Sequence, residues 1–89
     1  MKRTKKQEKK YTVFIIDENV HRNFGFMTAS RRHFDTIDEA NAYIERNRTM
    51  LREYNKEHPE WTPWLNCYRI KNNETKEFTD IIETPLTSL

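Results

Sequence analysis

Hydrophobic and polar positions alternate along this chain in patterns that predict strands on both sides of one helix. Residues 11–16 are all aromatic or β-branched, so both faces of an extended segment are apolar, which is typical of a strand inside a sheet. Residues 24–34, 64–71 and 76–82 also show extended patterns and predict three further strands. The turn-forming Asp and Asn residues in 17–23 predict a loop that joins the first two strands into a hairpin.

The clearest local signal is a capping box at the start of the predicted helix. The Thr36 hydroxyl can accept a hydrogen bond from the Glu39 amide, while the Glu39 carboxylate reaches back to the Thr36 amide. Apolar residues then recur at spacings of three and four and form one stripe, interrupted by Asn47. The stripe consists of Ile37, Ala40, Tyr43, Ile44, Met50, Leu51 and Tyr54. Pro59 predicts that the helix ends near residue 57.

This order of elements predicts an α+β fold of the type β-β-α-β-β. One helix packed on a four-stranded antiparallel sheet is the simplest way to cover the helix stripe. The first strand, apolar on both faces, belongs inside the sheet, which favours the strand order 2-1-3-4 because every neighbouring pair is then antiparallel. The order 2-1-4-3 remains an alternative. Residues 11–89 are expected to form a single domain, preceded by a flexible basic arm at residues 1–10.

The net charge of +2 divides unevenly between the arm and the domain. Residues 1–10 hold six Lys and Arg residues against one Glu, a net charge of +5, whereas residues 11–89 hold ten against thirteen acidic residues, a net charge of −3. The basic residues of the arm are Lys2, Arg3, Lys5, Lys6, Lys9 and Lys10. A charge division of this kind points to a solvated arm that can meet a polyanion.

Cysteine content and hydrophobic length favour a cytoplasmic protein. Cys67 is the single cysteine, so no disulfide can form within the chain, and it is expected to be a small buried hydrophobic residue. The apolar run at residues 11–16 is too short for a secretory signal or a membrane helix, which needs about 18 apolar residues. No membrane association is expected.

The sequence favours a protein that is not an enzyme and that has no cofactor. Gly25 is the only glycine, which excludes glycine-rich phosphate loops, dinucleotide fingerprints and nucleophile elbows. His21, His33 and His58 are not at metal-ligand spacing from one another or from Cys67, so no metal site is predicted. No small-molecule substrate is indicated either.

Strand alternation suggests that one face of the sheet is basic. If Phe24, Phe26 and Phe34 of the second strand face the helix, Arg31 and His33 lie on the opposite face, together with Met27. Placing Trp64, Tyr68 and Ile70 of the third strand under the helix sends Leu65, Cys67, Arg69 and Lys71 to that same open face. The first strand adds either Tyr11, Val13 and Ile15 or Thr12, Phe14 and Ile16.

A face with interleaved rings and cations suits RNA or single-stranded DNA, because bases stack on rings while Arg and Lys meet phosphates. The residues expected to bind nucleic acid are therefore the six cations of the arm together with Arg31, His33, Arg69 and Lys71. Lys and Arg also occur on the wet face of any half-exposed antiparallel sheet, and the ribonucleoprotein-type aromatic motif is missing.

Protein interaction is the alternative function. An open face that carries Met27, Leu65 and one apolar row of the first strand would favour a protein partner or a homodimer, and Trp61 is a suitable interface anchor. A small, glycine-poor, charged domain of this kind is also typical of stand-alone accessory or inhibitor proteins of phages and mobile elements. No motif indicates a known family.

Overall fold

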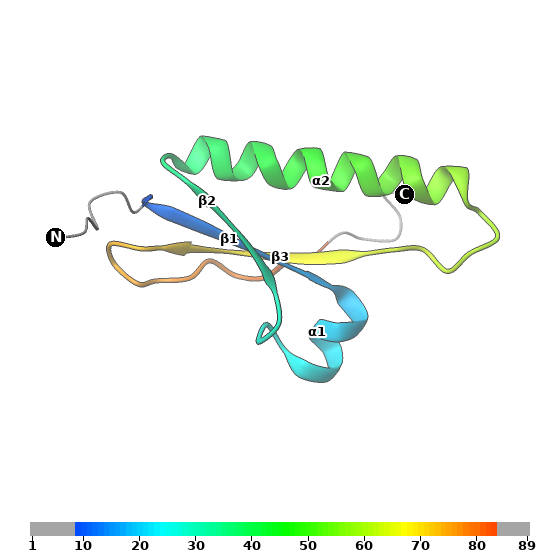
Figure 1. Cartoon of the computed structure of the whole chain (residues 1–89), viewed down its shortest axis with the longest axis horizontal. Helices are drawn as coiled ribbons and strands as arrows, with labels where there is room; N and C mark the ends of the chain where they lie inside the picture. Colours follow the sequence, from blue (N-terminus) through cyan, green and yellow to red (C-terminus); the bar gives the residue numbers. More distant parts are fainter. Residues whose placement is uncertain (1–8, 84–89) are drawn as a thin grey trace, which may run out of the picture.

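The computed structural model describes residues 9–83, and these form an α+β domain around one antiparallel sheet (Figure 1). The sheet contains β1 (Tyr11–Asp17), β2 (Ser30–Phe34), β3 (Asn66–Asn72) and β4 (Ile82–Glu83) in the order β2-β1-β3-β4. The predicted fold and the strand order 2-1-3-4 are therefore confirmed. Most of the predicted arm, residues 1–8, and the last residues of the predicted domain, 84–89, lie outside the described part of the chain.

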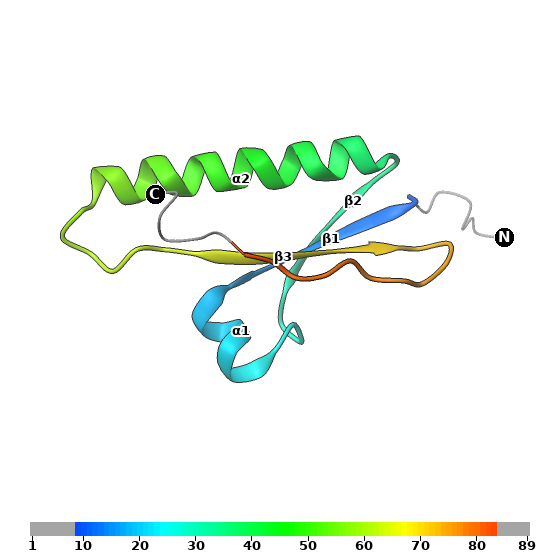
Figure 2. The same ribbon diagram turned by 180° about the vertical axis from the view of Figure 1, so that it is seen from behind.

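One long helix, α2 (Ile37–Glu57), lies along one face of the sheet (Figures 1 and 2). The predicted capping box is present: the Thr36 hydroxyl accepts from the Glu39 amide at 3.1 Å, and the Glu39 carboxylate accepts from the Thr36 amide at 3.3 Å. The helix ends before His58, as the proline at position 59 predicts. Its buried residues are Ala40, Ile44 and Leu51, all members of the predicted stripe, whereas Ile37 and Met50 of that stripe are exposed.

The core lies between α2 and alternate residues of the two central strands. Val13 of β1 and Tyr68 and Ile70 of β3 are buried with Ala40 and Ile44 of the helix. Since side chains alternate along a strand, this arrangement settles which residues of β1 face the helix. They are Tyr11, Val13 and Ile15, so Thr12, Phe14 and Ile16 lie on the other face.

The polar interruption in the helix stripe has a structural role. The Asn47 side-chain oxygen accepts hydrogen bonds from the Tyr68 hydroxyl and, at 3.1 Å, from the Asn66 side-chain amide. Tyr68 and Asn66 are both buried on β3, and buried polar groups require partners. Asn47, the polar residue in the helix stripe, is therefore the hydrogen-bond acceptor for two buried polar side chains of β3.

The predicted loop at residues 17–23 is wrong, because a second helix, α1 (Glu18–Phe24), forms there. Asp17 caps this helix by accepting a hydrogen bond from the Asn19 amide at 2.8 Å, and Gly25 ends it with a φ of 70°. Asp and Asn serve equally as turn residues and as helix caps, which explains the error. Helix α1 packs on the face of the sheet opposite α2 (Figures 1 and 2).

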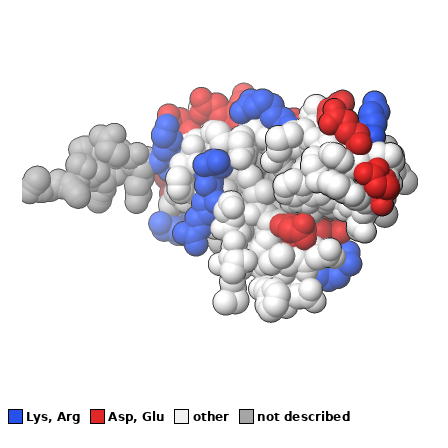
Figure 3. All heavy atoms as spheres, turned by 45° about the vertical axis from the view of Figure 1, so that its right-hand side comes forward, with Lys and Arg blue, Asp and Glu red and all other residues white. Residues whose placement is uncertain are grey.

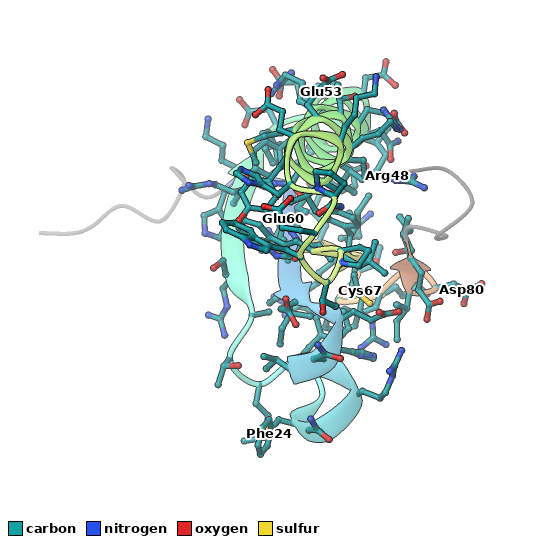
Figure 4. The ribbon with its side chains drawn as sticks, turned by 90° about the vertical axis from the view of Figure 1, so that its right-hand side faces the viewer. Phe24, Arg48, Glu53, Glu60, Cys67 and Asp80 are labelled. Carbon is teal, nitrogen blue, oxygen red and sulfur yellow. The ribbon has the colours of Figure 1, made fainter. Side chains whose placement is uncertain are left out.

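Two predicted strands are shorter than expected. Strand β2 begins at Ser30, so Phe24 and Phe26 precede it, and Phe24 projects from the end of the molecule remote from α2 (Figure 4). Strand β3 begins at Asn66 because the Asn55 side chain binds both backbone groups of Trp64, at 2.8 and 3.0 Å.

The predicted fourth strand, residues 76–82, pairs with β3 only in places. Phe78 forms an isolated antiparallel bridge with Lys71, and Ile82 begins the two-residue strand β4. Between them, the Thr79 hydroxyl accepts from the Ile70 amide at 3.1 Å, so a side chain replaces a backbone carbonyl and the regular ladder is interrupted.

Candidate nucleic-acid interface

The strand register places two rows of side chains on the face of the sheet opposite α2. In one row, Thr12 of β1 lies between its neighbours His33 of β2 and Lys71 of β3. In the second row, Phe14 lies between Arg31 and Arg69. The four basic residues that sequence analysis assigned to the open face of β2 and β3 are thus all on it.

Helix α1 and the turn that follows it cover one end of this face. Ile16 and Cys67 are buried there, and Figure 4 shows Cys67 on the side of β3 that faces α1. Burial, with smaller contributions from nearby carboxylates, raises the pKa of the Cys67 thiol to about 11. Because the thiolate is strongly disfavoured, Cys67 behaves as the buried hydrophobic residue that its sequence context predicts.

The other end of the face contains an open groove with a volume of about 650 Å³. Five basic side chains line it, together with Thr12, Phe14 and Asn73, and none of the described residues that line it is acidic. The basic residues are Lys9, Arg31, His33, Lys71 and Lys76. Figure 3 shows several Lys and Arg side chains on one half of the visible face, with Asp and Glu side chains along the upper edge of that half. We call this site the basic groove.

A hydrogen-bond network fixes the floor of the basic groove. The buried Thr12 hydroxyl oxygen accepts from the Asn73 side-chain amide at 2.9 Å and lies 3.0 Å from Nδ1 of His33. The same Asn73 amide group donates to the Lys9 carbonyl at 2.9 Å, and the Asn73 backbone amide donates to the Lys10 carbonyl at 2.8 Å. Asn73 therefore holds the chain that enters β1 against the rim of the groove.

Two carboxylates stand at the rim and pair with the first described cations. Lys9 lies 3.6 Å from Asp35, and Lys10 lies 4.0 Å from Glu74, with all four side chains largely exposed. Exposed pairs of this kind contribute about 0–1 kcal/mol, so a phosphate can replace either carboxylate at little cost.

Aromatic rings contact three of the cations on this face. The Arg31 guanidinium lies 5.4 Å from the Phe14 ring centroid, and the Lys71 ammonium lies 5.6 Å from that of Phe78. The Arg69 guanidinium is 4.4 Å from the Phe78 ring and 5.9 Å from the Phe26 ring. Its Nε is buried with no hydrogen-bond partner, so Arg69 packs among the rings beside the groove and does not line it.

Sequence analysis did not assign Lys76, Asn73 or Phe78 to the site. Lys76 adopts a φ of 69°, one residue after the turn that connects β3 to the segment containing Phe78. The pairing of Phe78 with Lys71 places its ring on the open face. These residues can be assigned to the site only when the register of the hairpin is known. The two asparagines at 72–73 indicate a turn but do not specify that register.

The three residues predicted for a protein interface lie on separate segments. Met27 is 84% exposed in the turn after α1, and the Leu65 carbonyl accepts from the Glu18 amide at 2.9 Å, where β3 meets α1. Trp61 stacks on His58 beyond the end of α2, with ring centroids 4.3 Å apart. The predicted interface residues thus lie after α1, just before β3 and beyond the end of α2.

The three histidines are on different elements, in α1, in β2 and after α2. Among residues 9–83, no group of three His, Cys, Asp or Glu side chains is placed to hold a metal ion. Within the same range, neither helix has the length and apolar character needed to span a membrane.

Comparison with known proteins does not assign a family to this chain. No protein-family model matches it, and neither the curated proteins nor the solved structures show a significant similarity to it. The evidence on function therefore comes from the site itself.

Proposed function

We propose that the protein is a non-enzymatic binding module that holds single-stranded nucleic acid in the basic groove. The observation that carries this proposal is the convergence of five basic side chains on a groove whose described lining contains no carboxylate. They come from the chain before β1, from β2, and from β3 and the turn after it. Residues 11–89 carry a net charge of −3, so this concentration of positive charge is local.

Phosphate groups suit these side chains better than an acidic protein surface does. Lys9, Arg31, Lys71 and Lys76 are four permanent cations along one groove, and a nucleic-acid backbone presents its charges as a regular line. Each phosphate that a cation neutralises releases condensed counterions, which drives binding at low salt. A protein ligand would need several carboxylates at matching spacing.

The shape of the site favours a single strand over a duplex. Phe14 lines the floor of the groove between cations, and unpaired bases can turn towards such a ring. In a duplex the bases stay stacked inside the helix, so only phosphates and sugars would reach the sheet. The open face of a sheet is a common platform for single strands for this reason.

The basic arm would add affinity that does not depend on nucleotide sequence. Lys9 already lines the groove, and Asn73 binds the backbone carbonyls of Lys9 and Lys10, so the described end of the arm lies at the rim of the groove. Lys2, Arg3, Lys5 and Lys6 contribute four further cations to that segment.

The test is the salt dependence of binding to a fluorescein-labelled single-stranded oligonucleotide. Replacing Arg31 and Lys71 with Ala should weaken binding at low salt and reduce the log-log salt slope by about 1.4, since each single-strand contact contributes roughly 0.7. The matched control is Arg46→Ala with Lys56→Ala, which removes one Arg and one Lys from α2 and should leave the slope unchanged. Equal effects of the two double variants, or no binding at low salt, would contradict the proposal.

Deleting residues 2–8 distinguishes the contribution of the arm to binding from that of the groove. The deletion keeps Lys9 and Lys10, whose backbone carbonyls accept hydrogen bonds from Asn73. The shortened protein should bind more weakly but remain sensitive to the Arg31 and Lys71 substitutions. If the deletion abolishes binding altogether, only the arm contacts phosphates and the groove has another purpose.

A protein partner or a second copy of the chain is the alternative function. Phe24 is 66% exposed at the end of the molecule remote from α2 (Figure 4), and Met27 is 84% exposed in the turn after α1. Exposed apolar side chains are frequent interface anchors. Sedimentation of the purified protein over a range of concentrations tests self-association. A dimer that the substitution Met27→Asp dissociates would favour this alternative.

A further inference from the structure

Phe78 occupies an unusual position beside the basic groove. Its backbone pairs with Lys71 across the irregular edge of the sheet, so both side chains lie on the open face. The Phe78 side chain is 45% exposed, although the helix-covered core contains other aromatic residues. Phe78 is thus a half-exposed ring next to a cationic groove, where a ligand in the groove can reach it.

The contacts of Phe78 hold its ring in a fixed place. The Arg69 guanidinium lies 4.4 Å from its centroid, and the Phe14 ring lies 5.9 Å away at an interplanar angle of 43°. The Arg69 guanidinium also lies 5.9 Å from the Phe26 ring and its Nε is buried, so Phe78 packs against a partly buried side chain. A ring that is fixed before binding loses little conformational freedom when a ligand stacks on it.

We propose that Phe78, supported by Phe14 and Arg69, is a subsite that stacks a nucleobase of the bound strand. This inference rests on the proposed function. Lys71 lies directly across from Phe78, with its ammonium 5.6 Å from the ring, so one nucleotide can place its phosphate at Lys71 and its base on Phe78. Every base has a π-face, so the subsite accepts bases of any identity and favours unpaired ones.

An oligonucleotide with abasic positions separates base stacking from phosphate binding, because it keeps every phosphate and lacks the bases. The protein should bind an oligothymidylate about tenfold more tightly than an abasic strand of the same length, the order of effect expected for stacking of one base. Phe78→Leu should remove most of this preference, apart from the share that Phe14 contributes, while leaving the affinity for the abasic strand and the salt slope unchanged. The control Ile81→Ala removes another exposed apolar side chain of the same segment and should keep the preference.

Each outcome distinguishes this inference from the function on which it rests. If the protein binds neither strand, the proposed function fails. If it binds both strands equally, or if Phe78→Leu keeps the preference, the groove still binds phosphates but Phe78 is not a stacking subsite.

A second variant covers the case in which Phe78→Leu fails to fold, which thermal unfolding would reveal. The indole introduced by Phe78→Trp should be quenched by oligothymidylate and much less by the abasic strand, after subtraction of the signal from Trp61 and Trp64. Equal quenching by both strands, or none, would overturn the proposal.

Discussion

The two faces of the sheet are built from the same three strands and differ in what covers them. On one face, Val13, Tyr68 and Ile70 are buried together with Ala40 and Ile44 of α2. On the opposite face, the short helix α1 covers one end, and the other end is left to the basic groove. Neighbouring residues such as Thr12 and Val13 therefore belong to different environments, one to the groove and one to the core.

This difference divides the molecule into a face that stabilises the fold and a face that is free to bind. A domain of this size has a small core. Each apolar side chain buried on the helix-covered face therefore contributes a large share of the free energy of unfolding. The charged side chains on the groove face contribute little to the free energy of unfolding, since ion pairs between exposed groups are weak. Substitutions on the two faces should therefore have separate consequences.

The largest expected effect is on the helix-covered face. Ile44→Ala should lower the free energy of unfolding by about 2–4 kcal/mol, because it removes buried methyl groups and leaves a cavity between α2 and the sheet. Leu51→Ala should act similarly. Met50→Ala, at a 56% exposed position of the same helix, is the control and should change stability by less than about 0.5 kcal/mol. Urea denaturation measures these values, and a larger effect at Met50 would show that the helix is wrongly oriented.

A smaller effect is expected for the polar contact between the helix and β3. Asn47→Ala should cost about 1–3 kcal/mol, because the Asn66 amide and the Tyr68 hydroxyl both lose an acceptor. A double-mutant cycle with Tyr68→Phe measures the coupling between the two residues. Additive effects of the two substitutions would mean that this hydrogen bond does not contribute to stability.

The smallest of the stability effects concerns the start of α2. Thr36→Ala should cost about 1 kcal/mol through loss of the side-chain cap on the Glu39 amide. Thr49→Ala, in the exposed middle of the same helix, should be neutral or slightly stabilising because Ala has the higher helix propensity. Thermal unfolding of the two variants provides the comparison. Equal unfolding midpoints would mean that the Thr36 cap does not stabilise the protein.

The regular parts of the fold could be predicted from the sequence because local patterns specify them. The Thr36–Glu39 capping box located α2, and alternation assigned Tyr68 and Ile70 to the covered face and Arg31 and Lys71 to the open one. Alternation works wherever a strand has one buried face, since a shift by one residue would expose the core.

The remaining parts depend on contacts that local patterns do not encode. The residues after Asp17 carry equally good signals for a turn and for a helix start, and packing of α1 on β1 and β3 decides between them. Phe78 lies on the open face through its bridge with Lys71, in a segment where Lys76 takes a φ of 69° and the Thr79 hydroxyl replaces a strand carbonyl. This pairing is a tertiary contact that the local sequence does not specify. For the same reason, sequence analysis located most of the cations of the site but not the ring beside them.

The most direct test of the account is to map the bound oligonucleotide on the protein by NMR. In a titration of the ¹⁵N-labelled protein with a short single strand, amide shifts should change mainly for the groove residues of β1 and β2, including Arg31 and His33, and for Lys71 to Phe78. The Nε resonances of Arg31 and Arg69 should move with them. In α2, neither the exposed residue Met50 nor Glu53, which points away from the sheet (Figure 4), should shift. Shifts concentrated on α2 or around Trp61, with none in the groove, would contradict the central claim.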